Sequence, residues 1–181
     1  MFDINDLTHG DCNIARLKID EAIDLEEIET IACLANEIWR EYYIPIIGRE
    51  QVDYMLARFQ NVTAIRHQIN SGYHYFLLSI GTEPVAYFAL LPDTEQNGLH
   101  ISKLYVRSNQ RRKGFGSQII AFIETYGHRH GLTQIWLTVN RQNHCAIDFY
   151  LRNKFINAGS LIQDIGNGFV MDDFKMVKNI T

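Results

Sequence analysis

The octapeptide QRRKGFGS, residues 110–117, carries three consecutive cations at positions 111–113, followed by two glycines. It lies between a stretch typical of a strand and an amphipathic stretch typical of a helix. A helix N-terminus is already positive, so three cations there are unfavourable unless an anion binds. Gly114 and Gly116 let a ligand approach the backbone N–H groups closely. The octapeptide therefore predicts a cradle for a phosphate or pyrophosphate, and a solvated basic turn is the alternative.

The glycine spacing excludes the best-known nucleotide loops. A dinucleotide-binding GxGxxG motif fails because Ile119 stands at the position of the third glycine. The sequence contains neither the GxxxxGK[ST] phosphate loop nor the protein-kinase motifs. What remains is the pattern R-x-x-G-x-G, formed by Arg111, Gly114 and Gly116.

Upstream of the octapeptide, hydrophobic periodicity predicts a strand, three helices and three strands. Asp24 has the position of an N-cap, and apolar residues recur behind it at three- and four-residue steps as far as Tyr43. Pro45 and Gly48 punctuate the chain after this helix. The other predicted helices cover residues 49–59 and 61–70, and the predicted strands cover residues 13–19, 73–80, 84–91 and 99–106.

Downstream of the octapeptide, the patterns predict a helix, a strand, a helix and two strands. Residues 134–139 are mostly apolar, which is typical of a buried strand. Two glycines at 166 and 168 indicate a hairpin turn. The predicted helices cover residues 116–130 and 143–153, and the last strands cover residues 155–165 and 168–178. This mixture of elements predicts an α/β (α+β) fold.

The strand at residues 99–106 contains a slip in its apolar pattern. Leu99 and Ile101 share one parity, whereas Leu104 and Val106 share the other. Because strand side chains alternate faces, the slip around Ser102–Lys103 predicts a β-bulge, a feature often found beside active sites. The alternative is a strand of ordinary amphipathic edge residues.

Length and composition fit a single domain spanning residues 1–181. The chain has 181 residues, of which 46% are hydrophobic and 21% are charged. It has 17 basic and 21 acidic residues, a formal net charge of −4. Proteins that bind nucleic acid usually have a basic excess, so no nucleic-acid partner is expected.

The cysteine pattern and the lengths of the apolar runs indicate where in the cell the protein is located. Cys12, Cys33 and Cys145 are odd in number and widely spaced, which favours buried thiols in a reducing compartment over disulfides or a zinc site. No apolar run approaches the roughly 20 residues that span a bilayer, and the N-terminal residues lack a signal-peptide pattern. We therefore expect a cytoplasmic protein with no membrane partner and no metal.

Two motifs together resemble the GNAT superfamily of acyl-CoA-dependent N-acyltransferases. Residues 111–116 are similar to the family's acyl-CoA loop, Q/R-x-x-G-x-G/A, which follows the fourth strand. Residues 143–150 are similar to the family's N-x-x-A-x-x-F-Y segment, and Phe155 matches the phenylalanine of the G-F pair that ends it. Lys154 departs from the glycine usual in that pair, so the turn before the sixth strand is where the geometry is in question.

The resemblance covers nearly the whole chain and implies a GNAT-like fold: a mixed, mostly antiparallel sheet of about seven strands flanked by helices, with a bulged fourth strand. It implies direct transfer of an acetyl group from acetyl-CoA to a primary amine in a ternary complex. Residues 38–56 and 165–173 look like a bacterial branch that includes polyamine acetyltransferases, so a polyamine, another small amine or a protein amine is expected. The alternative is a non-catalytic acyl-CoA sensor of the same fold. Dimers are common in the family, which makes a homodimer one expectation.

The resemblance also implies residue roles. The loop N–H groups would hold the pyrophosphate, and the bulged strand would pair with the pantetheine arm and stabilise charge on the thioester oxygen. Tyr150 would protonate the departing thiolate, with a core aromatic as the alternative, and Asn143 would contact CoA while also capping a helix. The implied cofactor-binding residues are Leu104, Tyr105, Val106, Arg111, Arg112, Lys113, Gly114, Phe115, Gly116, Ser117, Asn143 and Tyr150.

The general base and the acceptor pocket stay open. Many relatives carry a Glu on the fourth strand, but residues 99–106 contain no carboxylate. The net charge and the acidic candidates favour a cationic acceptor, on which aromatic rings would stack unless they serve only as core. The candidate bases are His100, Glu41, Glu37, Asp172, Asp173 and a water chain, and the candidate pocket residues are Trp39, Tyr42 and Tyr54.

Overall fold

The computed structural model describes residues 17–93, 95 and 97–180. The strands are β1 (Leu17–Glu21), β2 (His74–Ile80), β3 (Glu83–Asp93), β4 (Gly98–Val106), β5 (Gln134–Asn140), β6 (Ile156–Gly166) and β7 (Phe169–Asn179). The helices are α1 (Leu25–Tyr42), α2 (Ile44–Ile47), α3 (Arg49–Phe59), α4 (Val62–Asn70), α5 (Phe115–Arg129) and α6 (His144–Arg152), with a 3-10 helix at Ser108–Gln110.

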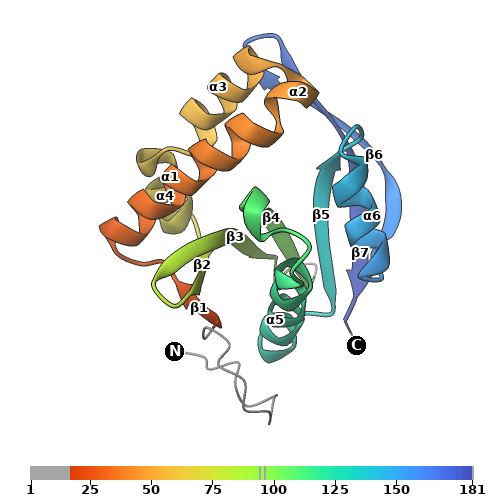
Figure 1. Ribbon diagram of the computed structural model, residues 1–181. Coiled ribbons are helices and arrows are strands. Elements are labelled where there is room, and N and C mark those ends of the chain that lie inside the picture. The colour runs from red at the N-terminus through yellow and green to blue at the C-terminus, as the bar shows by residue number, and fades with distance from the viewer. Residues whose placement is uncertain (1–16, 94, 96, 181) are drawn as a thin grey trace.

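The strands form one sheet in the order β1-β2-β3-β4-β5-β7-β6 (Figure 1). Neighbouring strands are antiparallel except for β4 and β5, which are parallel. The expected mixed, mostly antiparallel sheet of seven strands flanked by helices is therefore confirmed.

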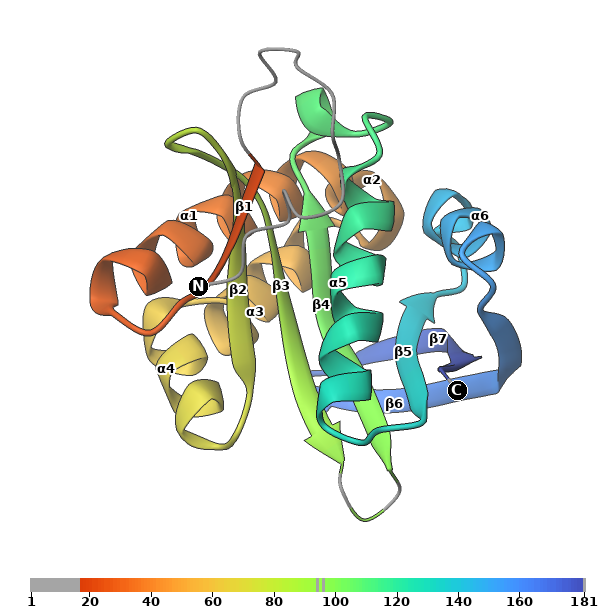
Figure 2. The same cartoon turned by 90° about the horizontal axis from the view of Figure 1, so that it is seen from below.

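Strand alternation gives this sheet two buried faces. In β3, Phe88 and Leu90 point into one core, whereas Tyr87 and Ala89 point into the other. Figure 2 shows α5 on one side of β2, β3 and β4, with α1, α3 and α4 on the opposite side. Because β3 is buried on both faces, it forms the centre of the molecule.

The first helix begins where the sequence places its cap. Asp24 accepts a hydrogen bond from the backbone N–H of Glu27 at 2.9 Å, and the Glu27 side chain accepts one from the Asp24 N–H at 3.2 Å. The helix ends at Tyr42 with Tyr43 as its C-cap, as expected, and residues 44–47 then form the short helix α2, which the periodicity does not predict. Pro45 lies in the first turn of α2, where a proline is tolerated because its missing N–H is not needed.

The slip in the fourth strand is a β-bulge, as expected. Lys103 lies opposite Ala89 and Ile101 lies opposite Leu90, so Ser102 has no partner on β3. The extra residue keeps Leu104 in the same core as Ile101, although the two residues differ in parity. The alternative of edge residues is wrong, because β4 lies inside the sheet between β3 and β5.

The parallel pair of β4 and β5 is short. Three residue pairs join the strands, from Gly98 opposite Gln134 to His100 opposite Trp136. Beyond them β5 continues to pair with β7, while residues 103–106 of β4 pair with β3 only. The two strands diverge past this point (Figure 1), which leaves one backbone edge of β4 without a partner strand.

The structure tests only part of what was expected for the first strand and the cysteines. Residues 13–16 of the first expected strand, and Cys12, lie outside the described residues. The expectation of buried thiols is wrong for Cys33 and Cys145, which are exposed because Cys33 lies off the buried stripe of α1 and Cys145 lies in the first turn of α6. Within the described ranges, no helix is both long and apolar enough to cross a membrane.

The residue that follows the end of α6 has a left-handed backbone conformation, although it is a lysine and not a glycine. Lys154 has φ +66°, its N–H donates to the Leu151 carbonyl at 3.0 Å, and the Phe155 N–H donates to the Tyr150 carbonyl at 3.0 Å. These two bonds form the Schellman end of a helix, in which glycine usually takes the left-handed position. A side chain with a Cβ costs about 1 kcal/mol there.

Replacing Lys154 with glycine is expected to raise the free energy of unfolding by about 0.5–1 kcal/mol, because it removes the left-handed strain and keeps both hydrogen bonds. Denaturant unfolding measures this change. Lys154→Ala is the matched control, since it also removes the lysine side chain but retains the Cβ. A glycine variant no more stable than the alanine variant would show that Lys154 is not strained.

Candidate active site

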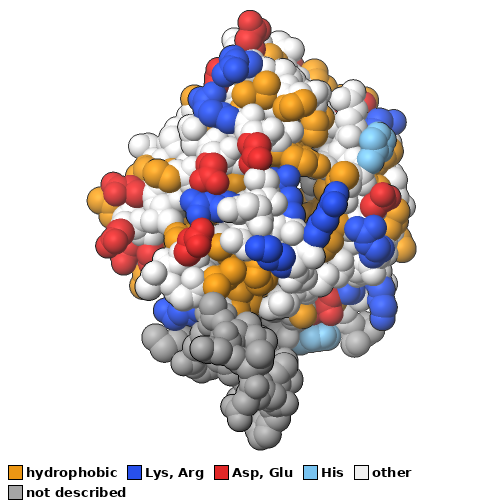
Figure 3. All heavy atoms as spheres, in the orientation of Figure 1, with side chains coloured by type: hydrophobic (Ala, Val, Ile, Leu, Met, Phe, Trp, Pro, Cys, Tyr) orange, Lys and Arg blue, Asp and Glu red, His pale blue; other side chains and the backbone are white. Residues whose placement is uncertain are grey.

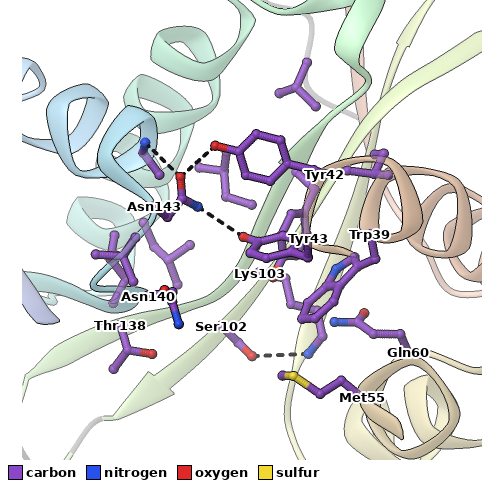
Figure 4. Close-up of a pocket in the computed structure, with 18 of the residues that line it drawn as sticks. Trp39, Tyr42, Tyr43, Met55, Gln60, Ser102, Lys103, Thr138, Asn140 and Asn143 are labelled. Atoms are coloured by element: carbon purple, nitrogen blue, oxygen red, sulfur yellow. Dashed lines mark hydrogen bonds between the residues drawn. The ribbon is translucent and has the colours of Figure 1, made fainter. Parts of the chain in front are cut away.

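A cavity of about 1590 Å³ opens where β4 and β5 diverge. Helices α1, α3 and α4 line one side, α5 and α6 line the other, and residues 101–106 of β4 and 137–140 of β5 lie between them. Figure 4 shows lining side chains from α1, β4, β5 and the start of α6 converging on this space. Pockets for one small ligand measure about 300–1,000 Å³, so this cavity has room for two molecules at once.

The loop before α5 presents backbone N–H groups to the cavity. Arg112 has φ +62° and Gly114 has φ +87°, and alternating left-handed residues turn successive N–H groups toward one concave side. The first backbone hydrogen bond of α5 runs from the Gln118 N–H to the Gly114 carbonyl at 3.1 Å. The N–H groups of residues 115–117 therefore have no backbone partner within the described part of the chain. This geometry fits a phosphate group.

The three cations of the loop have different roles. Arg111 donates from Nε to the Val106 carbonyl at 2.9 Å, and its guanidinium lies 4.5 Å from the centre of the Tyr42 ring. Arg112 and Lys113 are exposed. Lys and Arg side chains gather near the centre of the face in Figure 3, over the loop between β4 and α5. Arg111 thus fixes the loop to the protein, while Arg112 and Lys113 add positive charge at its surface.

The two loop glycines serve different needs. Gly114 caps α5 in a left-handed conformation that strains other residues. A Cβ on Gly116 would lie 2.9 Å from the Phe149 ring, so a glycine at this position lets α6 pack against the start of α5. The expectation for Gly116 considered a ligand and missed this packing role. Phe115 and Ser117 line the cavity beside the glycines.

Asn143 joins the two walls of the cavity. Its Oδ1 caps α6 by accepting from the Ala146 N–H at 3.2 Å and also accepts from the Tyr42 hydroxyl at 2.7 Å. Its Nδ2 donates to the Tyr43 hydroxyl at 3.3 Å (Figure 4). Asn143 is therefore a helix cap and, at the same time, a buried link between α1 and α6.

Tyr150 lies in the cavity wall as a protonated phenol. It is 7% exposed, and its ring packs against Phe149 and Phe155 at centroid distances of 5.2 and 5.4 Å. Burial, and secondarily the nearby Tyr43, raise the pKa of the Tyr150 hydroxyl, so it keeps its proton at neutral pH. Such a phenol is suited to donate a proton. Its ring also packs in the way expected if Tyr150 were only a core aromatic residue.

Three residues of β4 that were expected to bind the cofactor also line the cavity: Leu104, Tyr105 and Val106.

The carboxylates considered as bases do not all reach the cavity. Asp173 lines it and is 5% exposed, and burial raises the pKa of its carboxyl. Glu37 and Asp172 form ion pairs outside the cavity lining, with Arg107 at 3.0 Å and with Arg141 at 2.9 Å. Glu41 is exposed and also lies outside the lining.

His100 lies at the closed end of the strand pair, outside the cavity lining. Its ring stacks on Trp136 with centroids 3.8 Å apart. Burial lowers the pKa of His100 to about 4, with Lys103 and Lys175 adding repulsion, so the imidazole is neutral at neutral pH. Among the described residues, no group of three or more His, Cys, Asp or Glu side chains is arranged to hold a metal ion.

The aromatic residues of the expected pocket divide into two groups. Trp39 and Tyr42 line the cavity, whereas Tyr54 does not. The Tyr54 hydroxyl donates to the Ile165 carbonyl at 2.6 Å, and Arg58 Nη1 donates to the same carbonyl at 2.9 Å. These bonds hold the β6–β7 turn against α3, so Tyr54 supports the cavity wall from behind.

Sequence reasoning did not assign Lys103, a buried cation in the cavity wall. It is 7% exposed, and its Nζ donates to Gln68 Oε1 at 2.7 Å and to Ser102 Oγ at 3.2 Å (Figure 4). Its ammonium lies 5.2 and 5.6 Å from the ring centres of Tyr75 and Tyr73. The ion pairs of the described residues all involve other groups. Burial lowers the pKa of Lys103 to about 7.

The mixed sheet thus opens between its parallel strands, and a loop that fits a phosphate lies at one end of a cavity with room for two molecules. The model of the Acetyltransferase (GNAT) family matches residues 32–155. The chain therefore belongs to the GNAT family and is an acetyl-CoA-dependent acetyltransferase.

Similar proteins agree with this assignment. A spermidine N(1)-acetyltransferase from Thermoplasma acidophilum is 22% identical over 156 residues, covering 83% of this chain and 92% of that protein. An uncharacterized N-acetyltransferase in the pepI 3' region of Lactobacillus delbrueckii is 27% identical over 124 residues, covering 62% of this chain and 72% of that protein. The crystal structure of the Paia N-acetyltransferase from Thermoplasma acidophilum in complex with coenzyme A has a TM-score of 0.70 at 21% identity, covering 90% of this chain and 98% of that chain.

Lys103→Met is expected to be more stable than the wild-type protein at neutral pH, by a margin that shrinks as the pH rises toward 10. The folded protein holds this lysine at a pKa of about 7, whereas the unfolded chain binds the proton up to about pH 10.4. The unfolded state thus binds more protons between these values, and wild-type stability rises with pH. Urea unfolding at several pH values measures the difference.

The control is Lys18→Met, which removes an exposed lysine paired with Asp20 at 2.8 Å. Because this lysine is exposed, its removal reports the effect of losing a lysine charge without the effect of burial. Parallel stability curves for Lys103→Met and wild type would contradict the shifted pKa.

Proposed function

We propose that the enzyme transfers the acetyl group of acetyl-CoA directly to a primary amine while both are bound. The observation that carries this proposal is one cavity that joins a loop of free N–H groups to the open edge of β4. Its size supports simultaneous binding, which direct transfer requires. When bound, acetyl-CoA supplies the acetyl group as a thioester.

The residues around the loop are suited to hold this donor. The N–H groups of residues 115–117 would bind the pyrophosphate, and Arg112 and Lys113 would add charge attraction. The open backbone edge at residues 104–106 would pair with the extended pantetheine arm as an added strand. Asn143 would hold the facing wall at a fixed distance.

Two buried groups are suited to move the protons. Asp173 would accept the proton of the acceptor's ammonium group, since a carboxyl with a raised pKa is a stronger base near neutral pH. Tyr150 would deliver its proton to the sulfur atom as the C–S bond breaks and the new C–N bond forms, and the second proton lost from the nitrogen would restore the Tyr150 hydroxyl. Both residues line the cavity.

The acceptor class follows from family and relatives. We propose a primary amine, either a small molecule such as a polyamine or a protein amine, and the name of the Thermoplasma spermidine acetyltransferase supports the former. We also propose a bacterial, cytoplasmic enzyme that forms a homodimer. The edge strand β6 supports the dimer, because nearly all its residues are exposed, including the apolar Ile156, Leu161 and Ile162.

Release of free CoA thiol tests the proposal. With acetyl-CoA present, thiol release is expected only when a primary amine is added, from a panel containing spermidine, amino acids and a lysine peptide. Acetyl-CoA is also expected to raise the melting temperature, because it binds the folded state. The double variant Arg112→Glu/Lys113→Glu is expected to lose most of that shift.

Arg49→Glu is the control, since it reverses an exposed charge at the start of α3, outside the cavity lining. A melting shift without thiol release from any amine would identify a non-catalytic acyl-CoA sensor instead of an enzyme. The lack of a carboxylate on β4 is the feature that favours this rival.

Tyr150→Phe is expected to lower kcat at least roughly tenfold with acetyl-CoA affinity nearly unchanged, because general acid catalysis contributes about 10²–10⁴-fold. Steady-state kinetics and the melting temperature are measured on the same variant. Tyr126→Phe on α5, outside the cavity lining, controls for the loss of a phenol. A variant with wild-type kcat and a stability loss of about 1 kcal/mol would make Tyr150 a core aromatic only.

A further inference from the structure

The acceptor side of the cavity is cationic. Its walls on α1, α3, α4 and β4 carry Arg58 and Lys103, and none of the described lining residues on these elements is acidic. The acids that do line the cavity, Asp148 and Asp173, lie on α6 and β7. The carboxylates that favoured a cationic acceptor are thus absent from the described lining on this side.

Of the cations on these walls, Arg58 is already engaged. Its guanidinium donates to the Ile165 carbonyl at 2.9 Å and to the Tyr54 hydroxyl, and it lies against the Phe59 ring. These bonds hold the β6–β7 turn, so Arg58 serves the wall itself.

Lys103, in contrast, has more hydrogen-bond donors than described acceptors. A lysine ammonium has three N–H donors, and those of Lys103 have two described acceptors, Gln68 and Ser102. Both acceptors are neutral, so the charge has no described counter-ion. Figure 4 shows the ammonium end among the side chains of Met55, Gln60 and Ser102, at the floor of the cavity.

A buried charge without a counter-ion costs stability, and a methionine of similar length would avoid that cost. Lys103 also directly follows the bulge residue, on the part of β4 that has no partner on the β5 side. An anion placed against Lys103 would therefore lie close to residues 104–106, the part of β4 proposed to pair with the pantetheine arm.

We propose that Lys103 binds a carboxylate of the acceptor, and that the acceptor is a small primary amine that also carries a carboxylate, as an amino acid does. This inference rests on the proposed acetyl transfer and specifies its acceptor. The carboxylate supplies the missing counter-ion of Lys103, and the amine then extends toward Asp173 on the opposite side. Trp39, Met55 and Phe59 give the space between them an apolar surface.

Matched acceptors test the inference. Thiol release from acetyl-CoA is measured with each common amino acid, with its carboxamide, with β-alanine and γ-aminobutyrate, and with spermidine. The best carboxylate is expected to exceed its carboxamide at least about tenfold in kcat/KM, since a charge-assisted hydrogen bond supplies a factor of this order. Carboxamides carry the less basic amine, so intrinsic reactivity near neutral pH works against the expected result.

Lys103→Met is expected to erase this preference by raising KM for the carboxylate, while values for the carboxamide change little. Lys18→Met, which removes an exposed lysine of β1, is expected to keep the preference. Calorimetric titration of the best carboxylate into the CoA complex gives a second readout, with binding expected for wild type and lost in Lys103→Met.

Two results would overturn the inference and leave acetyl transfer intact. One is equal or better use of spermidine or of the carboxamides. The other is a Lys103→Met variant whose kcat falls equally on both members of every pair, since that would make Lys103 a proton acceptor. Lys103-dependent carboxylate binding without thiol release from any amine would instead overturn the acetyl transfer and keep the carboxylate site.

Discussion

The short parallel contact between β4 and β5 is the constraint on which the site depends. Three residue pairs hold the strands together at one end, and beyond His100 and Trp136 they separate. A sheet normally satisfies the backbone groups of an inner strand on both sides, so this separation leaves an inner strand with a free edge. The loop of free N–H groups follows directly from that strand. Cavity, open edge and loop are thus consequences of one interrupted pairing.

Interruption of a sheet also weakens it, and the structure compensates on both sides of the opening. Below the pairing, Leu99 and Ile135 share one core with the residues of α5. Above it, Asn143 links α1 to α6, and Tyr54 links α3 to the β6–β7 turn. These links use buried and half-buried polar groups, whose hydrogen bonds are strongest where water is excluded. The opening is therefore held at a set width by side chains instead of by backbone ladders.

Much of this arrangement follows from local sequence patterns. The cap at Asp24, the bulge after Ile101 and the glycine at 114 each depend on a few neighbouring residues, so the sequence predicts them. Lys103 escaped notice because a lysine in an isolated strand resembles an amphipathic edge residue, and its burial depends on α4, far away in the chain. Which carboxylate reaches the cavity was also beyond local reasoning, since the position of Asp173 depends on how β7 pairs with β5. The position of β4 inside the sheet, between β3 and β5, is likewise not contained in the pattern of residues 99–106 alone.

The bulge at Ser102 has a consequence for changes in chain length. Because strand side chains alternate, the extra residue is what lets Ile101 and Leu104 share one face although three positions separate them. Deleting Ser102 would restore plain alternation, so the side chains of residues 103–106 would keep their faces. Insertions and deletions are usually absorbed by loops, where no face is assigned. At this one position the bulge gives a strand the same tolerance, because a one-residue change in length leaves unchanged which side chains meet the substrates.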